Sequence, residues 1–214
     1  MTADFLAELP APQRLALSYS PGRARPATLA LLTLDARLAA ILRGRREPLA
    51  AQLRLAWWRD MFAKPAADWP VGEPLLEALR NWRDPTGLSA LADGWEALLA
   101  DELTPAVIEE FVAGREQGLS CLARQPDIDD QANVALAARL WALADLAAHL
   151  SDSSERALVV ERAEGLAVPR LNDALRPLAV LAGLGRAALD KGGAPLLSGP
   201  GSTLLALRIG LTGR

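Results

Sequence analysis

Segments with the spacing of an amphipathic helix, separated by proline and glycine, follow one another along the whole chain. In the segment 26–43 the large apolar residues recur at helical spacing: Leu31, Leu34, Leu38 and Ile41 or Leu42. Alanine and leucine, both strong helix formers, contribute 42 residues each to a chain of 214, whereas valine and isoleucine together contribute 12. A sheet needs β-branched and aromatic residues. The pattern therefore predicts an all-α protein.

Proline, glycine and capping residues predict where the helices begin and end. The clearest start is Thr104-Pro105, a capping hydroxyl followed by proline at the first helical position. Nothing along the chain marks a repeat or a domain boundary, so we expect a single-domain helical bundle over residues 1–214. Its helices are expected over about 12–19, 26–43, 48–64, 73–83, 88–100, 105–124, 127–150, 153–164, 177–189 and 203–211.

Charge and cysteine content exclude several classes of protein. The net charge of −3 lacks the basic excess of a general nucleic-acid binder, so no nucleic-acid partner is expected. A single cysteine, Cys121, forms no intramolecular disulfide and is expected to be a buried small hydrophobe. The N-terminal residues lack the basic start of a signal peptide, and the most apolar stretch, 177–185, is too short to span a bilayer. We expect a cytoplasmic protein, with peripheral association with the inner membrane left open.

Two adjacent tryptophans occur in the helix expected over 48–64. Four apolar residues of this helix fall on one line: Leu49, Leu53, Trp57 and Met61. Because neighbouring side chains point about 100° apart on a helix, we expect Trp57 to pack inside and Trp58 to lie at a boundary. The functional alternative is that Trp58 lines a pocket or a partner surface beside Arg54 and Arg59.

Two acidic patterns are candidate metal sites. Asp127 and Asp130 are three residues apart, but acids in the first turn of a helix are favoured by its unpaired amides and dipole, so capping is the preferred interpretation. Asp145, His149 and Asp152 follow i, i+4, i+7 spacing and share one face if the helix extends that far. They form a candidate site for a divalent ion. A solvated or ion-paired polar stripe is the preferred alternative.

The order and spacing of several segments resemble the squalene/phytoene synthase family. These segments begin near residue 15 and cover most of the chain: 15–25, 29–42, 53–60, 71–79 and 175–214. The resemblance implies an all-α bundle of the isoprenoid synthase type. Enzymes of this family join two prenyl diphosphates head to head, with Mg²⁺ held by two aspartate-rich helical motifs that face one another.

The residues at the matching positions depart from the family's catalytic pattern. The first aspartate motif falls on 39–43 (Ala-Ala-Ile-Leu-Arg), and the preceding Arg and Tyr fall on Ala36 and Leu32. The second motif falls on Ala142, Asp145, His149 and Ser153. Asp145 is its one replacement for a metal ligand, and Arg25 is the one retained N-terminal basic residue. An apolar first motif holds no Mg²⁺, so the resemblance argues against the family's own reaction.

The leading hypothesis is a non-catalytic isoprenoid-binding or assembly-factor-like protein that needs no cofactor. Arg25 and Trp58 are its candidate substrate-binding residues, and residues 54–60 (Arg-Leu-Ala-Trp-Trp-Arg-Asp) resemble the branch of the family known as a respiratory complex I assembly factor. The resemblance implies an isoprenoid or prenyl diphosphate ligand, and a membrane complex or an isoprenoid enzyme as protein partner. One alternative is a divergent phytoene or squalene synthase that acts on farnesyl or geranylgeranyl diphosphate, with Mg²⁺ at Asp145, His149 and Asp152. Another is a generic helical interaction module.

Overall fold

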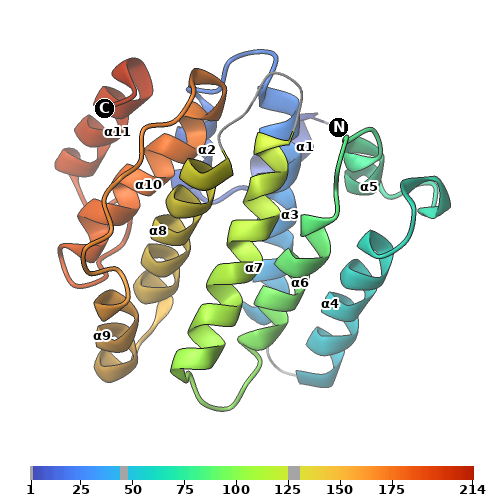
Figure 1. The fold of residues 1–214 in the computed structure, drawn as a ribbon, viewed down its shortest axis with the longest axis horizontal. Helices are drawn as coiled ribbons and strands as arrows, with labels where there is room; N and C mark the ends of the chain where they lie inside the picture. Colours follow the sequence, from blue (N-terminus) through green and yellow to red (C-terminus); the bar gives the residue numbers. More distant parts are fainter. Residues whose placement is uncertain (1, 44–47, 125–130) are drawn as a thin grey trace.

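The computed structural model describes residues 2–43, 48–124 and 131–214, and every regular element in these ranges is a helix (Figure 1). The prediction of an all-α protein is confirmed. The α-helices are α1 (Thr2–Glu8), α2 (Ala11–Leu17), α3 (Arg25–Arg43), α4 (Pro48–Phe62), α5 (Pro74–Leu79), α6 (Gly87–Ala97), α7 (Pro105–Ala123), α8 (Gln131–His149), α9 (Ser153–Glu161), α10 (Arg176–Leu189) and α11 (Pro200–Thr212). Two short 3₁₀ helices, η1 (Ala66–Asp68) and η2 (Asp173–Leu175), complete the described elements.

The helices form one bundle built around a row. Along this row α4, α6, α7, α8, α10 and α11 each pack against the next, with α4 and α11 at opposite edges (Figure 1). The helix α3 lies behind the row and packs against α4, α6 and α7, while α2 packs against α3, α10 and α11. Over the described residues, no helix is long and apolar enough to cross a membrane.

Glycines let α6 and α7 pack unusually close together. A Cβ atom on Gly114 would lie 2.4 Å from the carbonyl oxygen of Ala90 and 2.8 Å from the Cα atom of Gly94. A Cβ on Gly118 would lie 2.8 Å from that of Leu91. The two backbones therefore touch where most helix pairs are held apart by side chains. This contact brings Trp95, which follows Gly94, next to Arg115, which follows Gly114.

Most of the predicted helices are present, with ends shifted by a few residues. The Thr104 hydroxyl accepts a hydrogen bond from the Val107 amide at 3.3 Å, so the predicted cap of α7 is confirmed. Leu31, Leu34 and Leu38 of α3 are fully buried, as their spacing predicts. The helix α1 was not predicted. The acidic pattern at 127–130 lies outside the described residues.

The prediction for α4 was wrong about which face is buried. Leu49, Leu53 and Trp57 are exposed, at 68%, 64% and 40% of their surfaces. Trp58 is buried instead, and its ring stacks on that of Phe62 with 5.7 Å between centroids. Of the predicted line only Met61 is buried. The helix is apolar on two faces, because its buried residues also recur at helical spacing: Ala51, Leu55, Trp58, Met61 and Phe62. Periodicity alone does not choose between two such faces.

Candidate functional site

A cavity of about 750 Å³ lies inside the bundle. Its walls come from α3, α7 and α8, from the start of α2, from the end of α6 and from the segments 98–103 and 195–197. Much of the wall is apolar, including Ala36, Ala39, Leu42, Phe111 and Leu146. The volume falls within the range of roughly 300–1,000 Å³ that is usual for small-molecule sites.

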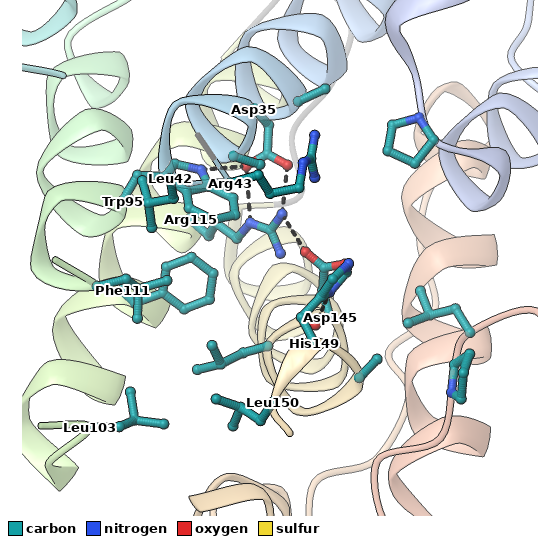
Figure 2. A pocket seen from close by; sticks show the side chains of 18 of the residues that line it. Asp35, Leu42, Arg43, Trp95, Leu103, Phe111, Arg115, Asp145, His149 and Leu150 are labelled. Atoms are coloured by element: carbon teal, nitrogen blue, oxygen red, sulfur yellow. Dashed lines mark hydrogen bonds and ion pairs between the residues drawn. The ribbon is translucent and has the colours of Figure 1, made fainter. Parts of the chain in front are cut away.

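A buried arginine forms part of the cavity wall (Figure 2). Arg115 of α7 is 1% exposed, and its Nε and Nη2 donate to the carboxylate of Asp35 on α3 at 3.0 and 2.6 Å. Nη2 also lies 2.9 Å from Oδ2 of Asp145 on α8. One guanidinium thus connects three helices through two carboxylates. Hydrogen bonds between charged groups are stronger than those between neutral groups, so these contacts fix the geometry of the cluster.

Aromatic rings surround the same guanidinium. Its central carbon lies 4.9, 5.2 and 4.3 Å from the ring centroids of Trp95, Phe111 and Trp141. The Trp95 indole N–H donates to Oδ1 of Asp35 at 2.9 Å, so one ring also holds the carboxylate. The close approach of α6 and α7 at their glycines places Trp95 beside Arg115. The rings shield the cation from water and contribute cation–π attraction.

The cluster keeps Arg115 charged despite its burial. Desolvation disfavours the charged guanidinium, whereas the charges of Asp35 and Asp145 and the hydrogen bonds to them favour it. The balance holds the pKa of Arg115 above its ordinary value. The side chain is therefore a permanent cation and a fixed hydrogen-bond donor.

The cluster leaves one donor of the guanidinium unused. Among the described residues, Nη1 of Arg115 has no hydrogen-bond partner, although the atom is buried. Figure 2 shows this nitrogen on the side of the guanidinium that faces away from Asp35. Gln13, which also lines the cavity and is 5% exposed, has an unpaired Oε1 over the same described ranges. A buried donor and a buried acceptor without partners thus belong to residues of the cavity wall.

The predicted metal site is brought together only in part. Asp145 and His149 both line the cavity, and Nδ1 of His149 lies 2.7 Å from the backbone oxygen of Asp145. Because α8 ends at His149, Asp152 is not on the same helix; it caps α9, where its carboxylate accepts from the amides of Ser154 and Glu155. Over the described ranges, no group of three or more His, Cys, Asp or Glu side chains is placed to hold a metal ion.

The two predicted substrate-binding residues lie outside the cavity wall. Arg25 donates from Nη1 to the backbone oxygen of Leu17 at 2.7 Å, which ties the start of α3 to the end of α2. Trp58 packs in the core between the rings of Trp57 and Phe62. Both side chains have a structural role in this arrangement.

Asp35 and Arg115 were not among the predicted site residues. Each interrupts the buried stripe of a long helix: Asp35 lies within the leucine stripe of α3, and Arg115 lies one turn from both Phe111 and Leu119 on α7. A charged residue on an apolar stripe is rarely buried unless it is paired. Two such residues of opposite sign, on different helices, were the signal in the sequence.

Comparisons of the chain with protein-family models, with curated proteins and with solved structures found no match. The candidate site therefore rests on its own geometry: an apolar cavity, a fixed cation in its wall, and one donor of that cation without a partner among the described residues.

Proposed function

We propose that the protein binds an isoprenoid-type molecule in this cavity without transforming it. The observation that carries the proposal is the unpaired Nη1 of a buried arginine that forms part of the wall of a largely apolar cavity. Such a site suits an elongated apolar ligand with one oxygen that accepts a hydrogen bond. The resemblance to squalene/phytoene synthases supports the same class of ligand. The matching positions Ala36 and Ala39 of α3 line the cavity together with Asp145 and His149 of α8.

The charges favour a neutral head group, such as an alcohol or a carbonyl, over a diphosphate. Five carboxylates and two arginines line the cavity: Asp35, Asp101, Glu102, Asp145, Glu155, Arg43 and Arg115. The donor that a head group would reach belongs to a guanidinium that two carboxylates already neutralise. A diphosphate at this point would bring further negative charge beside them, which is unfavourable where water screens poorly.

The same contacts argue against prenyl transfer. Ionisation of a prenyl diphosphate requires Mg²⁺ and several oxygen ligands. Two of the carboxylates that line the cavity, those of Asp35 and Asp145, already bind Arg115 at 2.6 and 2.9 Å. A metal ion would have to displace a guanidinium held among three aromatic rings. The proposed role is therefore binding rather than catalysis.

Retention of radiolabelled geranylgeraniol and geranylgeranyl diphosphate by the purified protein tests this function. We expect the alcohol to bind, the diphosphate to bind more weakly, and no pyrophosphate to be released in the presence of Mg²⁺. Ala39→Phe places a ring in the cavity and should abolish binding, whereas Ala40→Phe, at the neighbouring exposed position, should not.

Two results would contradict the proposal. One is equal retention of the alcohol by the Ala39→Phe variant and the parent protein. The other is formation of a head-to-head condensation product that Asp145→Ala abolishes, which would establish the synthase alternative. The assembly-factor role remains a prediction, and recovery of a membrane complex with the protein from its native host would test it.

A further inference from the structure

The helix α11 exposes leucines at the edge of the bundle. Leu204 and Leu211 are 65% and 69% exposed, and Leu207 is 44% exposed. At about 100° per residue, the three side chains lie within about 60° of one another around the helix axis. We call these three leucines the α11 face. Apolar side chains gathered in this way, rather than scattered singly, mark an interaction surface.

The opposite side of α11 fixes the helix on the bundle. Ser202, Ala206 and Ile209 are buried, and the Ile209 side chain packs directly over Gly183 of α10. The Tyr19 ring packs against Gly210. The α11 face therefore points outward, because the side with small residues and isoleucine is the one that packs on the bundle. Figure 1 shows α11 at the edge of the bundle.

Two segments at α11 contain cations and no acids in sequence. Residues 191–214 include Lys191, Arg208 and Arg214 and no Asp or Glu. Residues 9–34, which contain the α2 helix that packs against α11, include three arginines and again no acid. These six cations leave the other 17 Lys and Arg against all 26 Asp and Glu, a net charge of −9 for the rest of the chain. Outside these two segments the chain carries a net negative charge, although residues 36–59 contain six arginines and one acid.

We propose that the α11 face docks on an anionic lipid surface. The leucines would enter the boundary between headgroups and acyl chains while the exposed Arg208 stays at headgroup level. The acid-free segments would be attracted to lipid phosphates, and the acidic remainder would be held away from them. Charge separation of this kind orients a protein on a membrane without a spanning helix.

The charges also distinguish a lipid surface from a second copy of the chain. Two α11 faces packed against each other would bring Arg208, Arg214 and the arginines of 9–34 of both copies together, with no carboxylate from these segments to pair them. A second exposed apolar set, on α4, lies at the opposite edge of the bundle from α11 (Figure 1), and its Arg59 pairs with Asp60, Asp93 and Glu96. The leucines of α4 therefore provide a matched control of similar exposure that would lie far from a surface docked at α11.

Cosedimentation of the full chain with vesicles tests the proposal. We expect binding to phosphatidylcholine vesicles that contain phosphatidylglycerol, weaker binding to phosphatidylcholine alone, and a loss of binding as salt is added. The double variant Leu204→Ser/Leu211→Ser should lose at least about tenfold in affinity for these vesicles. Leu49→Ser/Leu53→Ser, which changes two leucines of similar exposure on α4, should bind like the parent. Both variants should keep the parent's circular dichroism, since the changed side chains are exposed.

Several outcomes would overturn the proposal. These are no binding to either vesicle, binding that is insensitive to phosphatidylglycerol and salt, or loss of binding in the α4 variant and not in the α11 variant. A concentration-dependent dimer that Leu204→Ser/Leu211→Ser abolishes would instead assign the face to a contact between copies. None of these outcomes depends on the cavity, so the proposal stands or falls separately from ligand binding.

Discussion

The ion cluster predicts that Arg115→Met is far more destabilising than loss of an ordinary arginine. Methionine keeps much of the apolar volume but leaves Asp35, whose side chain is 3% exposed, without its cation. Breaking a buried ion pair by removing one partner costs about 3–5 kcal/mol. The three ring contacts of the guanidinium are lost as well. We therefore expect a loss of about 4 kcal/mol or more, out of a usual total of about 5–15 kcal/mol.

Arg37→Met is the matched control for this measurement. Arg37 also binds two carboxylates, those of Glu8 and Glu73 at 2.7 Å, but its side chain is 27% exposed and theirs are 33% and 30% exposed. Water screens these pairs, so we expect a cost of about 1 kcal/mol or less. Urea unfolding followed by far-UV circular dichroism gives the free energy of unfolding of both variants and of the parent.

A double-mutant cycle separates the ion pair from the volume that Arg115 fills. Asp35→Asn alone should also cost several kcal/mol, but Asp35→Asn/Arg115→Met should cost less than the sum of the single changes by about 2 kcal/mol or more. If the Arg115→Met variant is as stable as Arg37→Met, the proposed electrostatic role of the cluster is wrong. An additive cycle would show that Arg115 acts through packing alone. Should Arg115→Met fail to fold, Asp35→Asn still tests the charge term against the same control.

Three further predictions concern other parts of the bundle. Gly114→Ala should cost about 1–3 kcal/mol, because the added methyl group meets a backbone oxygen of α6 at 2.4 Å, whereas Gly22→Ala, in open space, should leave the urea midpoint nearly unchanged. Burial raises the pKa of Cys121, so this thiol should react with a chromogenic disulfide reagent only after urea unfolds the chain; rapid reaction of the native protein would contradict its burial. Hydrogen bonds from the Thr86 hydroxyl and amide lower the pKa of Asp84 below its ordinary 3.8. The ionised Asp84 carboxylate therefore stabilises the fold above pH 3.8, and this stabilisation is lost as the pH falls through the lowered pKa of the folded state. The small difference in urea midpoint between Asp84→Asn and the parent should vanish in strong acid.

Local signals were sufficient for most of the helices because each signal acts over only a few residues. The cap at Thr104 and the stripe of α3 both depend on contacts within one or two turns, and both were predicted correctly. The α4 helix shows the limit of such signals. Its two apolar faces, one through Trp57 and one through Trp58, have the same period, and only packing against α6 and α3 decides which face is buried.

The candidate site was harder to predict because its central contact joins distant parts of the chain. Asp35 and Arg115 are 80 residues apart, and the indole that holds Asp35 comes from a third helix. Asp145 was identified through its spacing from His149, although its principal partner is Arg115. Spacing finds residues that share a face of one helix, but it does not find pairs that form only when two helices meet.

The volume and lining of the cavity are those of a small-molecule site. At about 750 Å³ the cavity falls within the usual range of roughly 300–1,000 Å³, and it is partly open to solvent, so a ligand has a way in. Its walls combine small residues of α3 and α8, such as Ala39 and Ala148, with an arginine whose own charge is fully paired. A leucine at either alanine would fill part of this space at little cost in helix formation. Small residues leave room for an apolar molecule, and the unpaired donor of Arg115 in the same wall can pair with one oxygen of that molecule.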